Sequence, residues 1–310
     1  MRALIIGGSG FVGRNLASFL ASRGAKLTVL DRSSDPLGGL DGVFLEGDAQ
    51  DPRVVVDALE HASPDVVYHL AANSDISAGI ADASLDFGDT LMTTIAVAQA
   101  CQVHPIRELV FASSSAIFGI TSQPISEHSQ DFYQPVSWYG KAKLASEYVL
   151  QDFSNRNKDT SVLLVRFPNV VGPKATHGVV YDFLRKLRSD PSKLQVLGDG
   201  YQQKPYVHVT ELVAGIEHFR TNMSACELDR INLGPSDTIN VRSIVDEVLA
   251  ATHIDAEVHY QDQPHGWIGD VPKYEFDTKK MQAGGFEIKK TSRQAIRAAI
   301  EDLLVEESIP

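Results

Sequence analysis

Apolar runs of strand length alternate with helical patterns through the first half of this chain, and this alternation is what most constrains its fold. The runs are almost continuously apolar, and they lie at residues 2–8, 26–31, 42–48, 65–72, 108–115 and 161–167. Amphipathic stretches of helical period stand between them, at 11–24, 51–62 and 139–156 among others. Strands that are apolar on both faces are typical of a parallel sheet covered by helices on each side. The sequence therefore predicts an α/β fold built on a doubly wound parallel sheet.

The second half is less regular and predicts a smaller domain interleaved with the end of the sheet. Helical patterns lie at 178–191, 210–222 and 241–252 and in the tail from Arg293, with a returning strand at 230–234 and a Gly/Pro-rich loop at 261–274. We expect one domain from residues 1–166 and 204–236, and a C-terminal domain from residues 167–203 and 237–310.

Charge and composition exclude several classes of function. The 310-residue chain has a formal net charge of −12, which disfavours binding to nucleic acid or to an anionic membrane surface. It has two cysteines without metal-like spacing, so we expect a reducing compartment and no metal site. The apolar run at the N-terminus is too short for a signal peptide, and no stretch reaches the length of a membrane span. A cytoplasmic protein is the expectation.

A glycine string joins the first predicted strand to the first predicted helix. Residues 7–13 read GGSGFVG, which fits Gly-x-x-Gly-x-x-Gly as well as Gly-x-Gly-x-x-Gly. Such a turn brings bare backbone to a pyrophosphate, and the helix N-terminus adds N–H donors and a favourable dipole. The string predicts a dinucleotide site that is formed by Gly7, Gly10, Phe11, Val12 and Gly13.

An acid at the end of the second strand indicates which dinucleotide binds. Asp31 can accept both hydroxyls of an adenosine ribose and would repel a 2′-phosphate, so NAD is favoured over NADP. Arg32, the next residue, leaves NADP open. Asp48 ends the third strand and is predicted either to meet the adenine or to cap a helix.

These motifs, with four more in the expected order, resemble the extended short-chain dehydrogenase/reductase family. The further motifs are His69–Ala72 (HLAA), the serine string Ser113–Gly119, the Tyr139-x-x-x-Lys143 pair and Arg166-x-x-Asn169. The likeness spans nearly the whole chain. It implies a Rossmann domain that binds NAD and a smaller C-terminal domain that binds substrate. The cofactor residues that it implies, besides those of the glycine string, are Asp31, Arg32, Asp48, Ala49, Leu70, Ala71, Ala72, Tyr139, Lys143 and Phe167.

The resemblance implies a catalytic set of Ser114, Tyr139 and Lys143, and physical chemistry agrees with it. A phenol with a pKa near ~10 is a weak base at neutral pH. A lysine four residues on lies on the same helix face, and its charge favours the phenolate. The family pattern places Ser114 in the catalytic position, and Ser115 is the alternative. Phe118 replaces the family's usual tyrosine.

The second half looks most like the nucleotide-sugar branch, and within it like small prokaryotic UDP-glucose/UDP-galactose 4-epimerases. The substrate residues that this likeness implies are Asn73, Ser115, Asn169, Val179, Val180, Leu197, Lys204, Tyr206 and His265. Lys204 and His265 stand where the family has arginines. Because arginine binds a diphosphate bidentately and neither lysine nor histidine does, these two replacements weaken the case for a tightly held UDP. The likeness therefore supports a nucleotide sugar more firmly than it supports UDP-galactose.

Four alternatives remain in view. A 4,6-dehydratase relative carries Asp-Glu after the catalytic serine or threonine, where this chain has Ser115 and Ala116. A decarboxylase needs an acid-sugar pocket with a well-placed arginine, which the residues at 204 and 265 do not favour. A net reductase would more often use NADPH, which Asp31 disfavours. A non-catalytic NAD-binding regulator would commonly lack the catalytic set. The family also implies a homodimer formed through helices at 86–103 and 138–155.

Overall fold

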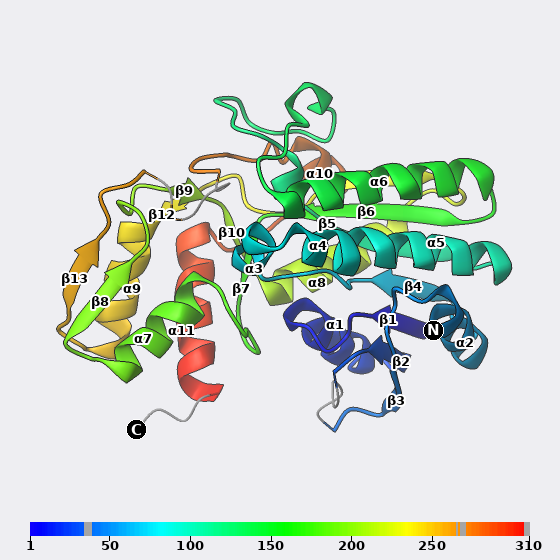
Figure 1. Ribbon diagram of the computed structural model, residues 1–310, viewed down its shortest axis with the longest axis horizontal. Coiled ribbons are helices and arrows are strands. Elements are labelled where there is room, and N and C mark those ends of the chain that lie inside the picture. The colour runs from blue at the N-terminus through cyan, green and yellow to red at the C-terminus, as the bar shows by residue number, and fades with distance from the viewer. Residues whose placement is uncertain (34–38, 265, 267–270, 307–310) are drawn as a thin grey trace. The chain divides into compact units, whose positions relative to one another are not determined.

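The computed structural model describes residues 1–33, 39–264, 266 and 271–306 (Figure 1). The chain groups into two compact units, each formed by three segments. The first unit consists of Met1–Ile117, Ser137–Arg166 and Val213–Ile231. The second consists of Phe118–Val136, Phe167–Leu212 and Asn232–Pro310. This division places residues 118–136, 204–212 and 232–236 in the second unit, whereas the sequence-based division assigned all three segments to the first.

A seven-stranded sheet in the order β11-β6-β5-β4-β1-β2-β3 forms the centre of the first unit. Its strands are β1 (Arg2–Ile6), β2 (Lys26–Asp31), β3 (Gly42–Glu46), β4 (Val66–His69), β5 (Glu108–Ser114), β6 (Ser161–Phe167) and β11 (Leu228–Asn232). The pairings of β1 with β2 and β4, of β2 with β3, and of β4 with β5 are parallel. The predicted doubly wound parallel sheet is confirmed.

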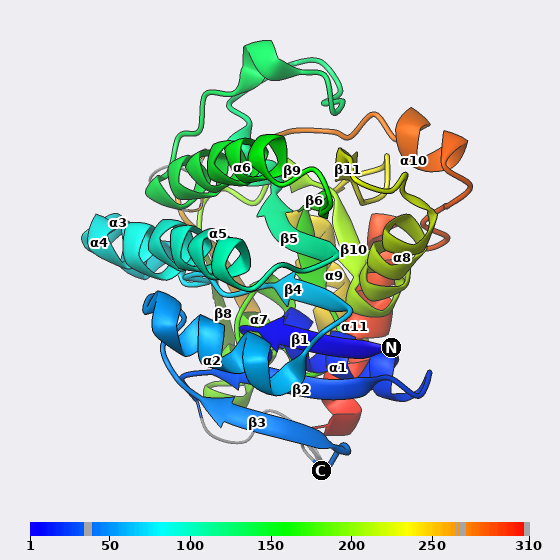
Figure 2. The same ribbon diagram turned by 90° about the vertical axis from the view of Figure 1, so that its right-hand side faces the viewer.

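Helices cover both faces of this sheet. They are α1 (Phe11–Ala21), α2 (Pro52–Ala62), α3 (Ile76–Ala81), α4 (Ala83–Asp86), α5 (Thr93–Val103), α6 (Trp138–Arg156) and α8 (Val209–Asn222). Figure 2 shows α2, α5 and α6 on one face of the sheet and α1 and α8 on the other. A π-helical turn, Phe87–Met92, joins α4 to α5.

The fully buried residues of the first unit explain why its strands read as unbroken apolar runs. One core cluster joins strand residues such as Leu4, Val67 and Phe111 to the helix residues Leu59 and Leu150. This cluster lies on one face of the sheet. Strand residues of the opposite face, such as Ile5, Val29 and Tyr68, are also fully buried, as a parallel sheet covered on both faces requires.

The described residues of the second unit form three small two-stranded sheets and further helices. Its strands are β7 (Asn169–Val171), β8 (Lys193–Val196), β9 (Gln203–Lys204), β10 (Tyr206–His208), β12 (Ile239–Asn240) and β13 (Glu257–Tyr260). Its helices are α7 (Val179–Ser189), α9 (Val241–Thr252), α10 (Lys279–Ala283) and α11 (Ser292–Glu306). Strand β10 pairs with β7 and β13 with β8, both in parallel, and β12 pairs with β9 antiparallel. In the described part of the chain, no helix is long and apolar enough to cross a membrane.

Candidate active site

Two glycines of the loop between β1 and α1 are required by packing. Gly7 has φ +83°, and a Cβ there would lie 2.4 Å from the backbone nitrogen of Ala71. A Cβ on Gly13 would lie 2.6 Å from the carbonyl oxygen of Gly7. Larger residues at either position would push the loop away from β4 or from the start of α1.

Gly10 differs, because no protein atom crowds it. It is exposed with ordinary extended backbone, and a Cβ there would meet only the Gly7 carbonyl oxygen, at 3.5 Å. Gly10 is also the N-cap of α1, yet it provides no side-chain cap for the first-turn N–H groups. An open backbone beside uncapped helix N–H groups suits a diphosphate. The loop therefore fits the dinucleotide that its sequence predicts.

The carboxylate of Asp31 is fixed from two sides at the end of β2. Its Oδ2 accepts the N–H of Ser9 at 2.9 Å, and its Oδ1 accepts the N–H of Ser33 at 3.1 Å. The first bond ties β2 to the glycine loop, so the ribose acid and the phosphate loop are held together. The side chain of Arg32, the next residue, does not pair with the Asp31 carboxylate; its guanidinium pairs with Asp89 at 2.9 Å.

The other predicted cofactor residues follow the carboxyl ends of neighbouring strands. Asp48 accepts the N–H of Gln50, whereas the cap of α2 is Asp51. The helix-cap alternative for Asp48 is therefore wrong. Buried Ala49 follows Asp48, and Leu70, Ala71 and Ala72 follow β4. Phe167 is the last residue of β6.

Ser114, Tyr139 and Lys143 come together where β5 ends and α6 begins. Ser114 is the last residue of β5, and its side chain hydrogen-bonds the phenol of Tyr139. The Ser114 hydroxyl oxygen also accepts the N–H of Ala116 at 3.1 Å, which fixes its position. Ser137 caps α6 by accepting the N–H of Gly140, so Tyr139 lies in the first turn of the helix.

Lys143 lies one helical turn beyond Tyr139 and is only 2 % exposed. Its Nζ donates to the carbonyl oxygen of Ala112 at 2.6 Å. The same atom lies 4.8 Å from the ring centre of Phe111 and 5.8 Å from that of Tyr139. The hydrogen bond to Ala112 in β5 therefore holds the ammonium group of Lys143 near the ring of Tyr139.

Burial shifts the pKa values of the Tyr139 phenol and the Lys143 ammonium group, and both shifts affect catalysis. It raises the pKa of Tyr139 to about 12; the hydrogen bond from Ser114 opposes this shift, and the negative charge of Asp86 adds to it. Burial lowers the pKa of Lys143 to about 7, against the opposing effect of Glu147. Tyr139 therefore needs further positive charge nearby before it can act as a base at neutral pH. The nicotinamide of bound NAD carries such a charge.

A buried ion pair behind the lysine was not predicted. Glu147 accepts from Arg166 at both oxygens, at 2.9 and 2.6 Å, and Ser113 donates to the same carboxylate. All three side chains are buried. The four-residue spacing of Tyr139, Lys143 and Glu147 places Glu147 on the same face of α6, but no local pattern indicates Arg166 as its partner.

Two predicted substrate residues lie in the first unit. Asn73 donates its amide to Asp86 and to the carbonyl of Asp75, and its Oδ1 accepts the N–H of Asp75. These bonds order the turn before α3. Ser115 begins a short 3₁₀ turn directly after Ser114.

The remaining predicted substrate residues lie in the second unit, except that His265 falls outside the described residues. Val180 and Tyr206 are buried in the core of that unit, and Lys204 is buried in β9. Leu197 is half exposed after β8, and Val179 begins α7. Asn169, in β7, holds a buried amide nitrogen that lacks a hydrogen-bond partner among the described residues. An unpaired buried donor is costly unless a ligand satisfies it.

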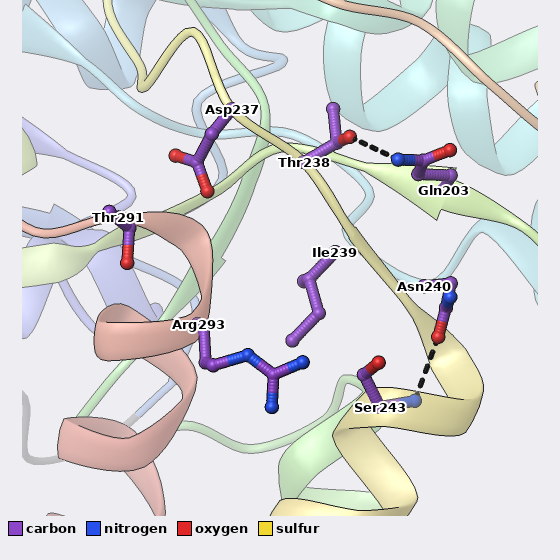
Figure 3. Close-up of a pocket in the computed structure, with 8 residues that line it drawn as sticks. All are labelled: Gln203, Asp237, Thr238, Ile239, Asn240, Ser243, Thr291 and Arg293. Carbon is purple, nitrogen blue, oxygen red and sulfur yellow. Dashed lines mark hydrogen bonds between the residues drawn. The ribbon is translucent and has the colours of Figure 1, made fainter.

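A separate pocket with a volume of about 420 Å³ lies inside the second unit. Figure 3 shows the residues that line it. Its lining residues are Gln203, Asp237, Thr238, Ile239, Asn240, Ser243, Thr291 and Arg293. Several polar side chains of this lining are engaged within the protein: Gln203 donates to Thr238, Asn240 caps α9, and Arg293 pairs with Glu247. None of the predicted catalytic residues lines this pocket.

Comparison with known proteins identifies the family. The model of the NAD dependent epimerase/dehydratase family matches residues 3–234. The chain belongs to this family. Membership makes NAD the cofactor, in agreement with the glycine loop and the Asp31 carboxylate.

Three similar proteins illustrate the range of activities near this chain. A UDP-galactose 4-epimerase of known crystal structure shares 29 % sequence identity with this chain. The match covers 99 % of each chain and has a TM-score of 0.87. The UDP-glucose 4-epimerase of Thermus thermophilus, solved in complex with NAD, is 26 % identical, covers 97 % of this chain and 98 % of its own, and has a TM-score of 0.85. The UDP-N-acetyl-alpha-D-glucosaminuronate decarboxylase of Bacillus cytotoxicus is 26 % identical over 91 % of this chain and 90 % of its own. Epimerases and a decarboxylase thus occur at similar identity.

Proposed function

We propose that this protein is an NAD-dependent nucleotide-sugar 4-epimerase that acts on a UDP-hexose of the glucose/galactose type. The observation that carries the proposal is the hydrogen bond between Ser114 and Tyr139, with the buried Lys143 one helical turn beyond Tyr139. This arrangement suits removal of a proton from a carbinol, and a non-catalytic NAD-binding protein would not need it. The named epimerases at 26–29 % identity support the substrate class.

The proposed reaction begins with oxidation of the sugar at C4. Tyr139, as phenolate, takes the proton of the 4-hydroxyl, and Ser114 hydrogen-bonds the same oxygen. Lys143 stabilises the phenolate by its charge. NAD, which the glycine loop and Asp31 would hold, would supply reversible hydride transfer at C4 when bound. The 4-keto sugar then turns over in the pocket, so that C4 takes the hydride back on its other face, and Tyr139 returns the proton to the 4-oxygen.

In this proposal Asn169 binds the sugar or its diphosphate through the amide nitrogen that lacks a partner among the described residues. Lys204 and His265 take the positions of the family's phosphate-binding arginines. The remaining predicted substrate residues, including Asn73, Ser115 and Leu197, stay predictions.

Two other reactions of the same family are alternatives. A decarboxylase is favoured by the similar protein from Bacillus cytotoxicus. A 4,6-dehydratase is disfavoured by Ser115 and Ala116, which replace the Asp-Glu pair that the elimination step uses in related enzymes.

The test is to incubate the purified protein with UDP-glucose, UDP-glucuronic acid and UDP-N-acetylglucosamine separately, without added NAD, and to identify the products by NMR. We expect UDP-galactose from UDP-glucose. Carbon dioxide and a UDP-pentose from UDP-glucuronic acid would establish a decarboxylase, and a 4-keto-6-deoxy sugar a dehydratase. No product from any UDP-sugar would overturn the proposal.

We also propose that the protein is a homodimer formed through α5 and α6. Large apolar side chains are exposed there, including Trp138, Tyr148 and Val103. Light scattering should give twice the mass of one chain, and Tyr148→Asp should shift it towards the monomer. A monomeric native protein would contradict this proposal.

A further inference from the structure

The arginine that follows the ribose acid is held by a second carboxylate. The guanidinium of Arg32 donates to Oδ2 of Asp89 at 2.9 Å. The Arg32 side chain is 55 % exposed and that of Asp89 only 19 %, so the acid is the more fixed partner.

Asp89 is anchored independently of Arg32. Its Oδ1 accepts the side-chain amide of Gln50 at 3.2 Å, and its carbonyl oxygen accepts the hydroxyl of Thr93 at 2.8 Å. The residue lies in the π-helical turn between α4 and α5, a kind of turn that often occurs at functional sites. Asp89 therefore presents its carboxylate to Arg32 from a preset position.

The surroundings of Arg32 are strongly acidic. Asp89, Asp48 and Asp31 all interact favourably with its charge, and the hydrogen bond to Asp89 is the largest cause of its raised pKa. An arginine beside the ribose acid is the group that would bind a 2′-phosphate in an NADP enzyme. Here its charge is already balanced.

We propose that Asp89 is a specificity-determining residue for the cofactor: it holds Arg32 in an ion pair and so denies a 2′-phosphate its cation. Asp31 repels the phosphate directly, and Asp89 removes the compensation that Arg32 would otherwise offer. The proposal concerns the cofactor that family membership assigns, and it does not depend on which sugar the enzyme converts.

The test compares NAD and NADP binding to nucleotide-free protein by isothermal titration calorimetry. Asp89→Asn keeps the shape of the residue and a group that can bond Gln50, but it frees Arg32. We expect the ratio of NADP affinity to NAD affinity to rise about tenfold, which corresponds to about 1.4 kcal/mol. Asp57→Asn, at an exposed position on α2, changes the net charge equally and should leave the ratio unchanged.

Two further variants separate this account from a general change of charge. Arg32→Ala alone should leave the ratio of NADP affinity to NAD affinity within twofold of the wild type, because Arg32 is already ion-paired with Asp89. In the double variant Arg32→Ala/Asp89→Asn the gain should disappear. The proposal is overturned if Asp89→Asn leaves the ratio within twofold of the wild type, if the gain persists without Arg32, or if Arg32→Ala alone weakens NADP binding more than fivefold relative to NAD.

Discussion

The side chain of Ser114 hydrogen-bonds the phenol of Tyr139, and this bond favours the ionised tyrosine against the effect of burial. Ser114→Ala should therefore raise the pKa of Tyr139 and leave less phenolate at a given pH. We expect kcat to fall about 100-fold at pH 7, within the range for acid–base groups. The loss should shrink as the pH rises, because the phenolate is then recovered.

The pH dependence of kcat checks this expectation, and Ser115→Ala is the matched control. The control should keep the profile of the wild type if Ser114 is the serine that bonds Tyr139. A Ser115→Ala variant with the larger loss would assign the catalytic role to the alternative serine.

Lys143 should cost the protein stability near neutral pH. Its pKa is lowered from 10.5 to about 7 in the folded protein, so between these values the unfolded chain binds a proton that the folded chain does not. Stability is therefore lost through this group as the pH falls from about 10.5 to about 7. Lys143→Met should abolish activity but raise Tm at pH 7.

Thermal unfolding at pH 7 and pH 9.5 tests this linkage. The Tm advantage of Lys143→Met over the wild type should be smaller at pH 9.5, because the pH then approaches the lysine pKa of the unfolded chain and protonation stabilises that chain less. An advantage that is the same at both values, or a variant less stable at pH 7, would contradict the account.

The buried pair of Glu147 and Arg166 should matter far more than an exposed pair on the same helix. Glu147→Gln leaves a buried guanidinium without its counter-charge, which costs about 3–5 kcal/mol. Asp152→Asn breaks the exposed pair of Asp152 with Arg156 and should cost at most about 0.5 kcal/mol. Urea unfolding measures both free energies, and equal values for the two variants would refute the assignment of a structural pair behind Lys143.

The glycines of the loop should separate folding from cofactor binding. Gly10→Ala meets no crowded atom, so the nucleotide-free protein should keep its stability while NAD affinity falls at least about tenfold, since the side chain would occupy the approach of the diphosphate. Gly13→Ala should lower both, because its Cβ would clash with the Gly7 carbonyl. Calorimetry measures the NAD affinity of each variant, and Tm measures its stability. Undiminished NAD binding by Gly10→Ala would show that the loop does not approach the cofactor.

The sequence predicted the sheet well because its strands are buried on both faces and read as unbroken apolar runs. The runs containing Leu4, Val29 and Leu163 became β1, β2 and β6 with nearly the expected bounds. The small strands of the second unit escaped notice because β9 and β12 have two residues each, too few for any period to appear.

The catalytic set could be predicted because its spacing reflects a helix turn and a strand end. The ion-pair partners of the charged residues could not be predicted from the sequence. Asp89 binds Arg32 across 57 positions of sequence, and Glu147 binds Arg166 across 19, and neither distance follows from a local pattern. Only the fold brings the π-helical turn beside the end of β2.

The most direct test of the central claim follows the hydrogen at C4 of the sugar. UDP-glucose deuterated at C4 is incubated with the protein in ordinary water without added NAD, with Tyr139→Phe as the inactive control, and the product is analysed by mass spectrometry and NMR. We expect UDP-galactose that keeps the deuterium at C4, because the hydride leaves and returns within one active site. Loss of the label to water, or turnover that the Tyr139→Phe variant retains, would contradict it.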